Sequence, residues 1–397
     1  MAVTSEATVN GGAMRTYRIA ILGCRGRGTS AARAYHIHPR CQIVGLCDLL
    51  PERLQTLGEE LSVSARFTDL DDMIKETQPD IVAMPTATEL HYDLCMRVLE
   101  YGTHIEVEKP MCATLDQADT VLRKVRAKGV CMAVHHQGRC GASMRAITTA
   151  IKEGRIGELR YMTASGKGYY GGYGLMNIGT HLVNNLLHLA GHCRSVSAMA
   201  HTDGRPVEPE DVLSSPSGMG TICGERITAT LHFDKNVTGT LIHHRVSQVD
   251  STAYGIEILG TDGRLFWKSD AAWHLPNPHF VPDGANDQWV ALPLSYPDGF
   301  DPGGAANEAD YAFVDEFVQA LDEKREHLCS GVAGRHVMEV LMGIFESAAY
   351  GQRVLLPQED RHHPLLRWRK EHGLHDPEPL PRDLFTWLEL EDQRLGR

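Results

Sequence analysis

The sequence predicts an α/β protein with two domains: a doubly wound parallel sheet first, then an α/β domain with a large open, mostly antiparallel sheet. Three observations predict this fold. Short apolar strands alternate with helical segments as far as residue 139. After Gly154, apolar and polar residues alternate along the strands, as they do when one sheet face is buried. A chain of 397 residues is also long enough for two cores.

Composition restricts the class of protein. Hydrophobic residues make up 42% of the chain and charged residues 23%, values that are typical of globular domains. The formal net charge of −12 offers no basic surface for phosphate backbones, so we expect no nucleic-acid partner. No run of about 18 apolar residues occurs, so we expect no membrane partner.

The chain divides into four segments. Residues 1–14 are polar and are expected to be a disordered leader rather than a signal peptide. Residues 15–139 are predicted to form the first domain, residues 140–358 the second, and residues 359–397 a C-terminal extension that packs across the surface or a neighbour. Ten cysteines without a CxxC pair are typical of a reducing compartment, so we predict a cytoplasmic location.

A glycine-rich turn follows the first strand. The strand, residues 17–22, ends in Gly23-Cys24-Arg25-Gly26-Arg27-Gly28, and residues 29–35 have helical composition. Strand, glycine turn and helix are the context of dinucleotide binding, in which a pyrophosphate meets the helix N-terminus. The first and last fingerprint positions are glycine, but an arginine occupies the middle one. We predict that the coenzyme is bound by Gly23, Arg25, Gly26, Arg27 and Gly28.

Asp48 follows a second apolar strand, residues 42–47, and lies twenty residues after Gly28. In a Rossmann domain, an acidic side chain at this position binds the adenosine ribose and repels a 2′-phosphate. We therefore predict NAD as the coenzyme. The alternative for Asp48 is a turn or helix-cap carboxylate. NADP stays open because three arginines could neutralise its phosphate: Arg25, Arg27 and Arg53.

Residues 102–110 are predicted to form a short strand that presents a lysine at its end. Helical periodicity precedes and follows this segment, so Lys109 would stand at the carboxyl end of a parallel strand, where ligands collect. Pro110 biases Lys109 away from helical dihedral angles, which keeps the lysine at the rim. A catalytic lysine is the functional interpretation, and an ordinary solvated lysine is the alternative.

The second domain carries two predicted hairpins. Residues 227–233 and 237–245 alternate apolar and polar positions around a turn at 234–236. Residues 254–259 and 265–267 form the second hairpin. One face of this sheet would be buried, and the open face could receive a ligand or another subunit.

The segment 175–188 predicts a helix with a polar stripe. At about 100° per residue, Asn177, His181, Asn184 and His188 fall on one side, opposite apolar residues. Solvated helix faces are usually rich in Lys and Glu, whereas amides and imidazoles bind uncharged hydroxyl groups. We predict a substrate-binding stripe that points away from the core.

A glycine-rich loop upstream carries Lys167, Tyr169, Tyr170 and Tyr173, which could form a sugar-binding wall or could simply pack. The chain has 21 histidines but no HExxH motif and no Cys/His cluster with ligand spacing, so no metal is expected.

Residues 17–357 together resemble the Gfo/Idh/MocA family of NAD(P)-dependent oxidoreductases. The most specific motifs are Glu108-Lys109-Pro110, the turn from Thr86 to His91, and Gly179-x-His181. The resemblance implies hydride transfer between a nicotinamide coenzyme and a hydroxyl or ketone of a sugar, glycoside or cyclitol. It also implies a homo-oligomer formed through the open sheet, and a catalytic pair of Lys109 and His181.

Further site residues follow from these motifs. Asn177 is assigned to the catalytic group beside Lys109 and His181. Coenzyme contacts beyond the glycine turn and Asp48 are assigned to Thr86, Thr88, His91, Glu108, Lys109 and Gln137. Substrate contacts are assigned to Lys109, Arg139, Tyr169, Tyr170, Asn177, His181 and Asn184.

The chain departs from the family pattern at two positions, where Asn177 and Asn184 replace the usual aspartates. An amide cannot hold a positive imidazole by charge, so we expect either a less basic His181 or a larger share of the proton transfer for Lys109.

Two alternative functions stay open. One is redox-neutral glycoside cleavage, by oxidation at C3, elimination and return of the hydride. The other is an NAD-binding regulator without catalysis, against which Lys109 and His181 argue.

Overall fold

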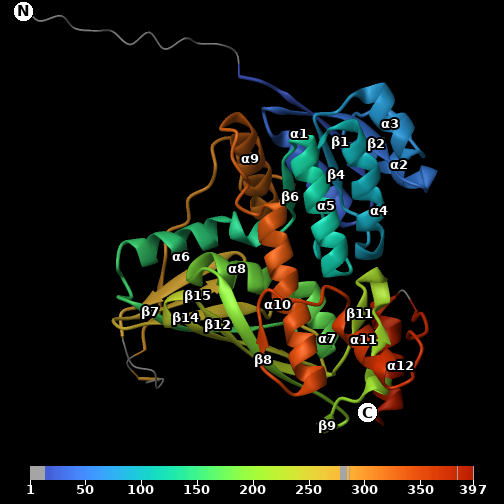
Figure 1. The fold of residues 1–397 in the computed structure, drawn as a ribbon. Coiled ribbons are helices and arrows are strands. Elements are labelled where there is room, and N and C mark those ends of the chain that lie inside the picture. The colour runs from blue at the N-terminus through green and yellow to red at the C-terminus, as the bar shows by residue number, and fades with distance from the viewer. Residues whose placement is uncertain (1–13, 278–283, 286, 382, 397) are drawn as a thin grey trace, which may run out of the picture.

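The computed structural model describes residues 14–277, 284–285, 287–381 and 383–396, which form two large sheets with helices packed on them and a separate two-stranded hairpin (Figure 1). The predicted disordered leader, apart from Met14, lies outside the described residues. The first sheet contains six parallel strands in the order β3-β2-β1-β4-β5-β6. These strands are β1 (Tyr17–Leu22), β2 (Cys41–Cys47), β3 (Arg66–Phe67), β4 (Ile81–Met84), β5 (His104–Val107) and β6 (Met132–Val134).

Helices cover this first sheet, which explains why its central strands are continuously apolar. All residues of β4 are fully buried, as expected for a parallel strand with both faces covered. The strand order reverses between β1 and β4, so a crevice opens outside their carboxyl ends. The predicted doubly wound parallel sheet is confirmed. Its helices are α1 (Arg27–Ile37), α2 (Pro51–Glu60), α3 (Leu70–Thr77), α4 (Thr88–Val98) and α5 (Leu115–Lys128).

The second sheet has ten strands in the order β17-β16-β15-β14-β7-β13-β12-β8-β18, with β9 paired to β8. The pair β7 and β13 is parallel and the other pairs are antiparallel, so the predicted mostly antiparallel sheet is confirmed. Its strands are β7 (Leu159–Ser165), β8 (Cys193–Thr202), β9 (Arg205–Pro206), β12 (Arg226–Phe233), β13 (Thr238–His244), β14 (Gly255–Gly260), β15 (Arg264–Lys268), β16 (Ala271–Leu275), β17 (Val290–Ala291) and β18 (Val354–Leu355).

One face of the second sheet is covered by α6 (Ala142–Lys152), α8 (Thr180–Ala190) and α10 (Gly331–Tyr350) (Figure 1). The alternation in β12 follows from this arrangement. Ile227 and Leu231 are fully buried, whereas Thr228 and Thr230 are partly exposed on the open face. The period of two along the sequence therefore corresponds to one covered and one uncovered face.

Helix α9 (Glu308–Asp322), although late in the chain, packs on the first sheet. Phe313 and Phe317 are fully buried in the same core as Ile19 and Ile21 of β1. The Tyr17 hydroxyl donates a hydrogen bond of 2.8 Å to the Asp322 carboxylate. The two domains are therefore joined by a helix that returns from the second to the first.

The C-terminal extension forms α11 (Pro364–Glu371) and α12 (Leu384–Arg394), which pack on this same chain near the hairpin of β10 (Leu213–Ser214) and β11 (Thr221–Ile222) (Figure 1). Trp387 lies edge-on against Tyr170, with ring centroids 5.1 Å apart. Arg245 and Asp392 form an ion pair of 2.7 Å. The extension thus covers the surface of its own second domain.

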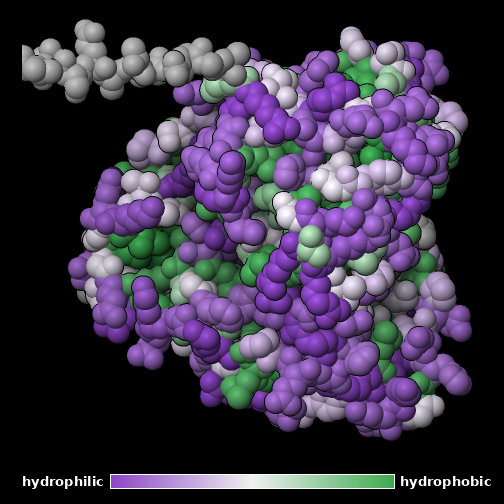
Figure 2. Space-filling view, turned by 45° about the horizontal axis from the view of Figure 1, so that its top comes forward, coloured by the Kyte–Doolittle hydropathy of each residue, from purple (hydrophilic) through white to green (hydrophobic). Residues whose placement is uncertain are grey.

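Hydrophilic side chains cover most of the face seen in Figure 2, and hydrophobic ones show between them in separate patches. Among the described residues, no helix is both long and apolar enough to cross a bilayer.

Candidate active site

The glycine turn lies at the carboxyl end of β1, beside the point where the strand order reverses. Gly23 has a φ of +103°, which disfavours any other residue. A Cβ atom on Gly28 would lie 1.9 Å from the carbonyl oxygen of Gly23, so this position admits no side chain. Arg25, in the middle fingerprint position, is exposed, and Gly26 has open space around it. The turn therefore leaves its backbone accessible to a pyrophosphate, as the fingerprint predicts.

Asp48 is tied to the glycine turn. One carboxylate oxygen accepts the N–H of Cys24 at 2.8 Å, and the other accepts the N–H of Leu50 at 3.0 Å. The nearest guanidinium nitrogen of Arg53 is 4.0 Å away. The carboxylate is thus held at the end of β2, at the position from which an adenosine ribose would be recognised.

Arg27, at the start of α1, contacts two acidic side chains. Its Nε donates to Glu108 at 3.0 Å and its Nη2 donates to Asp310 at 2.8 Å. Both carboxylates have side chains less than 10% exposed, at 9% and 0%. The guanidinium is therefore engaged by two carboxylates, although the sequence suggested it as a coenzyme ligand.

His135 extends this ionic cluster. Its Nδ1 lies 2.6 Å from Glu106 and its Nε2 lies 3.0 Å from Asp310. Burial alone would lower the pKa of His135, but the two carboxylates outweigh burial and raise it to about 10. The Tyr35 hydroxyl donates to Glu106 from the opposite side. The cluster joins α1, β5, α9 and the residue that follows β6, next to the end of β5 that carries Lys109.

The turn after β4 carries a hydroxyl group, that of Thr86, beside the glycine turn. Thr86 lies next to Gly23, and its Oγ1 is buried without a hydrogen-bond partner. The His91 ring lies between the carbonyl oxygens of Thr86, at 3.0 Å, and Pro110, at 2.9 Å. Thr88 is buried at the start of α4. His91 therefore couples this turn to the peptide that follows Lys109.

Lys109 meets the second domain at the end of β5. Its Nζ donates to the backbone oxygen of Asn177 at 3.2 Å and to the side-chain Oδ1 at 3.3 Å. Burial lowers the pKa of Lys109, Glu108 opposes this change, and the cations Arg27 and Lys167 add to the lowering. The lysine is therefore easier to deprotonate than a solvated one.

Asn177 lies in a π-helical turn, Leu175–Gly179, that precedes α8. The angle of 100° per residue does not hold through such a turn, and π-turns are frequent at functional sites. The Asn177 Nδ2 donates to the Tyr173 hydroxyl at 3.2 Å, which orients the amide oxygen toward Lys109. Tyr173 in turn packs edge-on against Tyr169, with ring centroids 5.5 Å apart.

His181 follows in the first turn of α8. Its ring lies 5.6 Å from the His136 ring, nearly perpendicular to it. Burial first, and then the charge of Lys109, lower the pKa of His181 well below its usual value. Burial also lowers the pKa of His136 to about 3, and its Nε2 lies 2.8 Å from the Thr180 hydroxyl. His181 is therefore a neutral imidazole and a weaker base than a solvated one.

The rest of the predicted polar stripe does not face solvent, which corrects the sequence-based expectation. Asn184 is fully buried, and its Oδ1 accepts a bond of 3.4 Å from Arg139. His188 lies 3.0 Å from the Thr148 hydroxyl of α6. The stripe packs on α6 and on the 3-10 turn Gln137–Arg139, because the sequence gives the period of a helix but not its neighbours.

Two further predicted residues occupy different surroundings. Tyr170 is 1% exposed and packs on Trp387 of α12, so it contributes to the contact with the C-terminal extension rather than to a substrate wall. Gln137 lies in the turn after β6, and its Oε1 is buried without a partner. Sequence reasoning did not assign Glu106, His135 or Asp310 to the site. No spacing could indicate them, because the cluster joins residues up to 283 positions apart.

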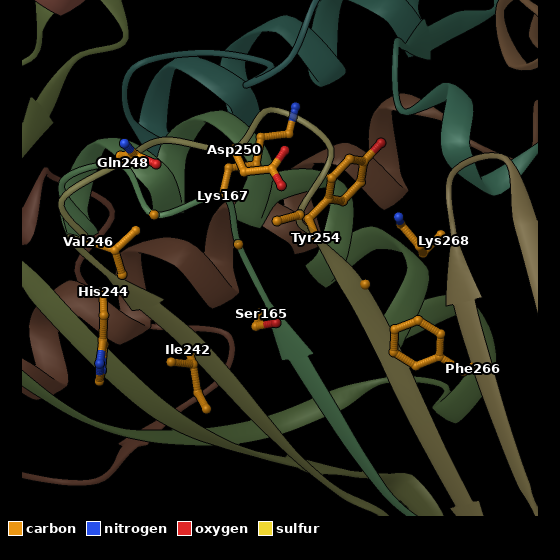
Figure 3. A pocket seen from close by; sticks show the side chains of 14 residues that line it. Ser165, Lys167, Ile242, His244, Val246, Gln248, Asp250, Tyr254, Phe266 and Lys268 are labelled. Atoms are coloured by element: carbon orange, nitrogen blue, oxygen red, sulfur yellow. The ribbon is translucent and has the colours of Figure 1, made fainter.

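A separate cavity of about 600 Å³ lies on the open face of the second sheet. Figure 3 shows Lys167, Asp250 and Tyr254 gathered at one end of it, and Phe266 and Lys268 beside the neighbouring strand. The Lys167 Nζ lies 4.7 Å from the centroid of the Tyr254 ring. Among the described residues, no group of three or more His, Cys, Asp or Glu side chains is arranged to hold a metal ion.

The accessible glycine turn, the position of Asp48 and the buried Thr86 hydroxyl without a partner define a dinucleotide-binding Rossmann domain. Residues 17–136 match the oxidoreductase family model described as an NAD-binding Rossmann fold. Residues 149–356 match the model for the C-terminal α/β domain of the same family. The chain belongs to the Gfo/Idh/MocA oxidoreductase family, as its motifs predict.

Individual relatives are distant. The chain is 23% identical over 357 residues to D-glucoside 3-dehydrogenase of Escherichia coli (strain K12), covering 85% of this chain and 97% of that protein. The fold is similar to that of levoglucosan dehydrogenase in complex with NADH, with a TM-score of 0.72, 18% identity, and coverage of 87% of this chain and 100% of that one. A shorter match, 29% identical over 113 residues, covers 26% of this chain and 24% of a glycosyl hydrolase family 109 protein of Bacteroides thetaiotaomicron.

Proposed function

We propose that this protein is an NAD-dependent dehydrogenase or reductase that acts on a CH–OH group of a sugar, glycoside or cyclitol. The observation that carries the proposal is the convergence of Lys109 with the turn that precedes His181, across the two domains. A full-length relative at 23% identity is named a D-glucoside 3-dehydrogenase, which supports this substrate class.

The roles of the residues follow from their protonation. When bound, the nicotinamide supplies the hydride acceptor for oxidation and the hydride donor for reduction. His181, held neutral, accepts the hydroxyl proton. Lys109 stabilises the developing alkoxide and orients it, while Asn177 fixes the ammonium group. Ketone reduction uses the same groups in the reverse direction.

NAD is the proposed coenzyme rather than NADP. Asp48 places a carboxylate where a 2′-phosphate would lie, and Arg27 is engaged with Glu108 and Asp310. The exposed Arg25 and the nearby Arg53 are cations that a 2′-phosphate would contact, so we expect some activity with NADP, lower than with NAD.

The test is a panel of monosaccharides, disaccharides, inositols and glycosides, followed at the absorbance of reduced nicotinamide with NAD and with NADP. The Lys109→Met variant should keep NAD binding and lose turnover by a factor of about a thousand or more. The exposed Lys75→Met variant is the matched control and should behave as wild type. Unchanged turnover in Lys109→Met would reject the assignment.

A second candidate function is redox-neutral glycoside cleavage, in which oxidation at C3 acidifies the neighbouring C–H bond and the hydride is finally returned. The lowered pKa of Lys109 favours it, because elimination needs a second base beside His181. A local match to a glycosyl hydrolase family 109 protein points the same way. Coenzyme that survives gel filtration, together with glycoside cleavage and no accumulating NADH, would distinguish this route from net dehydrogenation.

We further propose a cytoplasmic homo-oligomer assembled through the open face of the second sheet. Met199, which is 63% exposed, and Leu355, which is 68% exposed, lie on its strands β8 and β18. The proposed domain division is 15–139, 140–358 and 359–397, with α9 returning to the first domain. Light scattering should give a mass above one chain, and Met199→Glu should lower it.

A further inference from the structure

Two cationic side chains, Lys109 and Arg139, each contact an asparagine, and these asparagines lie on either side of His181 in the sequence. The Nζ of Lys109 donates to the Asn177 Oδ1 at 3.3 Å, and the Nη1 of Arg139 donates to the Asn184 Oδ1 at 3.4 Å. Asn177 precedes His181 by four residues, and Asn184 follows it by three. An amide oxygen accepts a hydrogen bond but carries no charge, so neither cation is neutralised by its partner.

The nearby carboxylates are occupied elsewhere. Glu108 is bound by Arg27 at 3.0 Å, and Asp310 is bound by the same guanidinium at 2.8 Å. Neither Lys109 nor Arg139 has a carboxylate within ion-pair distance in the part of the chain that the structure describes, and the Nε of Arg139 is buried without any partner. Partly buried cations without counter-ions are costly, which favours an anionic ligand.

We propose that the substrate is a sugar acid, a uronate or its glycoside, whose carboxylate binds Arg139 while its reacting hydroxyl lies between Lys109 and His181. This inference rests on the proposed dehydrogenase function. Lys109 and Arg139 contact amides seven positions apart, one on each side of His181, so one sugar ring with its carboxylate is proposed to reach both cations. A guanidinium presents paired N–H groups that match a planar carboxylate, and one such group suits a monoanion better than a dianionic phosphate.

The experiment compares matched sugars that differ only in charge. The pairs are D-glucose with D-glucuronate, D-galactose with D-galacturonate, and 4-nitrophenyl β-D-glucoside with 4-nitrophenyl β-D-glucuronide, and glucose 6-phosphate is the phosphate arm. Turnover is followed through NADH formation, and binding to the NADH-loaded protein is followed by calorimetry. We expect kcat/KM for at least one acid to exceed that of its neutral partner by a factor of ten or more, and to fall with added salt.

Two variants test the residue assignment. Arg139→Met should lower the ratio of acid to neutral kcat/KM at least tenfold, and Arg139→Lys should restore part of it. Asn184→Asp, which is nearly isosteric, places a carboxylate against Arg139 and should lower the same ratio tenfold. The exposed Arg126→Met also removes one positive charge and should leave the ratio unchanged.

The outcomes separate the two proposals. Turnover of neutral sugars with acid-to-neutral ratios at or below one, or a ratio that Arg139→Met and Asn184→Asp leave unchanged, overturns the sugar-acid inference and leaves the dehydrogenase standing. A preference for glucose 6-phosphate over glucuronate also overturns it. Uronate binding that depends on Arg139, without turnover under either coenzyme, rejects the dehydrogenase and with it the sugar acid as substrate, and leaves only a carboxylate-binding site at Arg139. Neither binding nor turnover rejects both.

Discussion

Lys109 and Asn177 are 68 positions apart in the chain, yet the lysine ammonium donates to two oxygens of this one asparagine, at 3.2 and 3.3 Å. The contact crosses from the carboxyl end of β5 in the first domain to the π-helical turn before α8 in the second. Because the partner is an amide, the ammonium is oriented without gaining a counter-ion. Burial and neighbouring cations can therefore lower the pKa of Lys109.

The Asn177→Asp variant should reverse this effect. A carboxylate in contact with Lys109 favours the charged ammonium and raises its pKa, so the alkaline limb of the oxidation rate, along which the ammonium is lost, should move to higher pH by about one unit. The measurement is the pH profile of kcat with NAD and the best substrate of the panel. Asn236→Asp, on an exposed turn, is the control. A profile that stays in place would mean that Lys109 does not limit the rate through its protonation.

Arg27 is predicted to stabilise the fold. Its removal leaves Glu108 and Asp310 buried without their guanidinium, and breaking a buried ion pair typically costs 3–5 kcal/mol. Since the Arg27 side chain is 39% exposed, screening reduces this value, and we expect Arg27→Met to lower the free energy of unfolding by about 2–3 kcal/mol. Urea denaturation measures it. Arg25→Met, two positions earlier and exposed, should change the same quantity by less than about 0.5 kcal/mol.

The ionic cluster should also make stability depend on pH. The pKa of His135 is about 10 in the folded protein, above its usual value of 6.5, so its contribution is fully present below pH 6.5 and disappears as the pH rises through 10. Between these limits the free energy of unfolding should fall by up to about 1.4 kcal/mol per pH unit. Urea denaturation at pH 7, 8.5 and 10 checks this slope. His135→Gln should flatten it, and equal slopes in both proteins would contradict the assignment.

Short-range sequence patterns predicted the parts of the fold that depend only on neighbouring residues in the chain. The strand, turn and helix around Gly23 and Gly28 follow from short-range periodicity and from the lack of space for a side chain, and the same holds for the strand before Lys109. The π-turn at 175–179 could not be predicted, because propensity does not distinguish it from an α-helical turn. The contact of Arg27 with Asp310 depends on how α9 packs, which no spacing in the sequence encodes.

The surroundings of Tyr170 could not be predicted from the sequence either. The loop composition suggested a sugar-binding wall, and Tyr173 does contact Asn177, while Tyr169 packs on Tyr173. Tyr170, one position along, points the opposite way and is covered by a helix more than 200 residues later in the chain. Which side of a loop each tyrosine occupies is decided by packing partners rather than by the residue type.

The contact between Tyr170 and Trp387 leads to a final prediction about the C-terminal extension. Trp387 is 3% exposed, and truncating a buried tryptophan typically costs 3–5 kcal/mol. We therefore expect Trp387→Ala to lower the free energy of unfolding by about 3 kcal/mol, or to release α12 as a separate early transition. Phe385→Ala on the same helix is the matched control, because Phe385 is 59% exposed and its loss should cost less than about 0.5 kcal/mol. Urea denaturation followed by circular dichroism and by tryptophan fluorescence separates these results, and equal effects of the two variants would show that the extension is not anchored through Trp387.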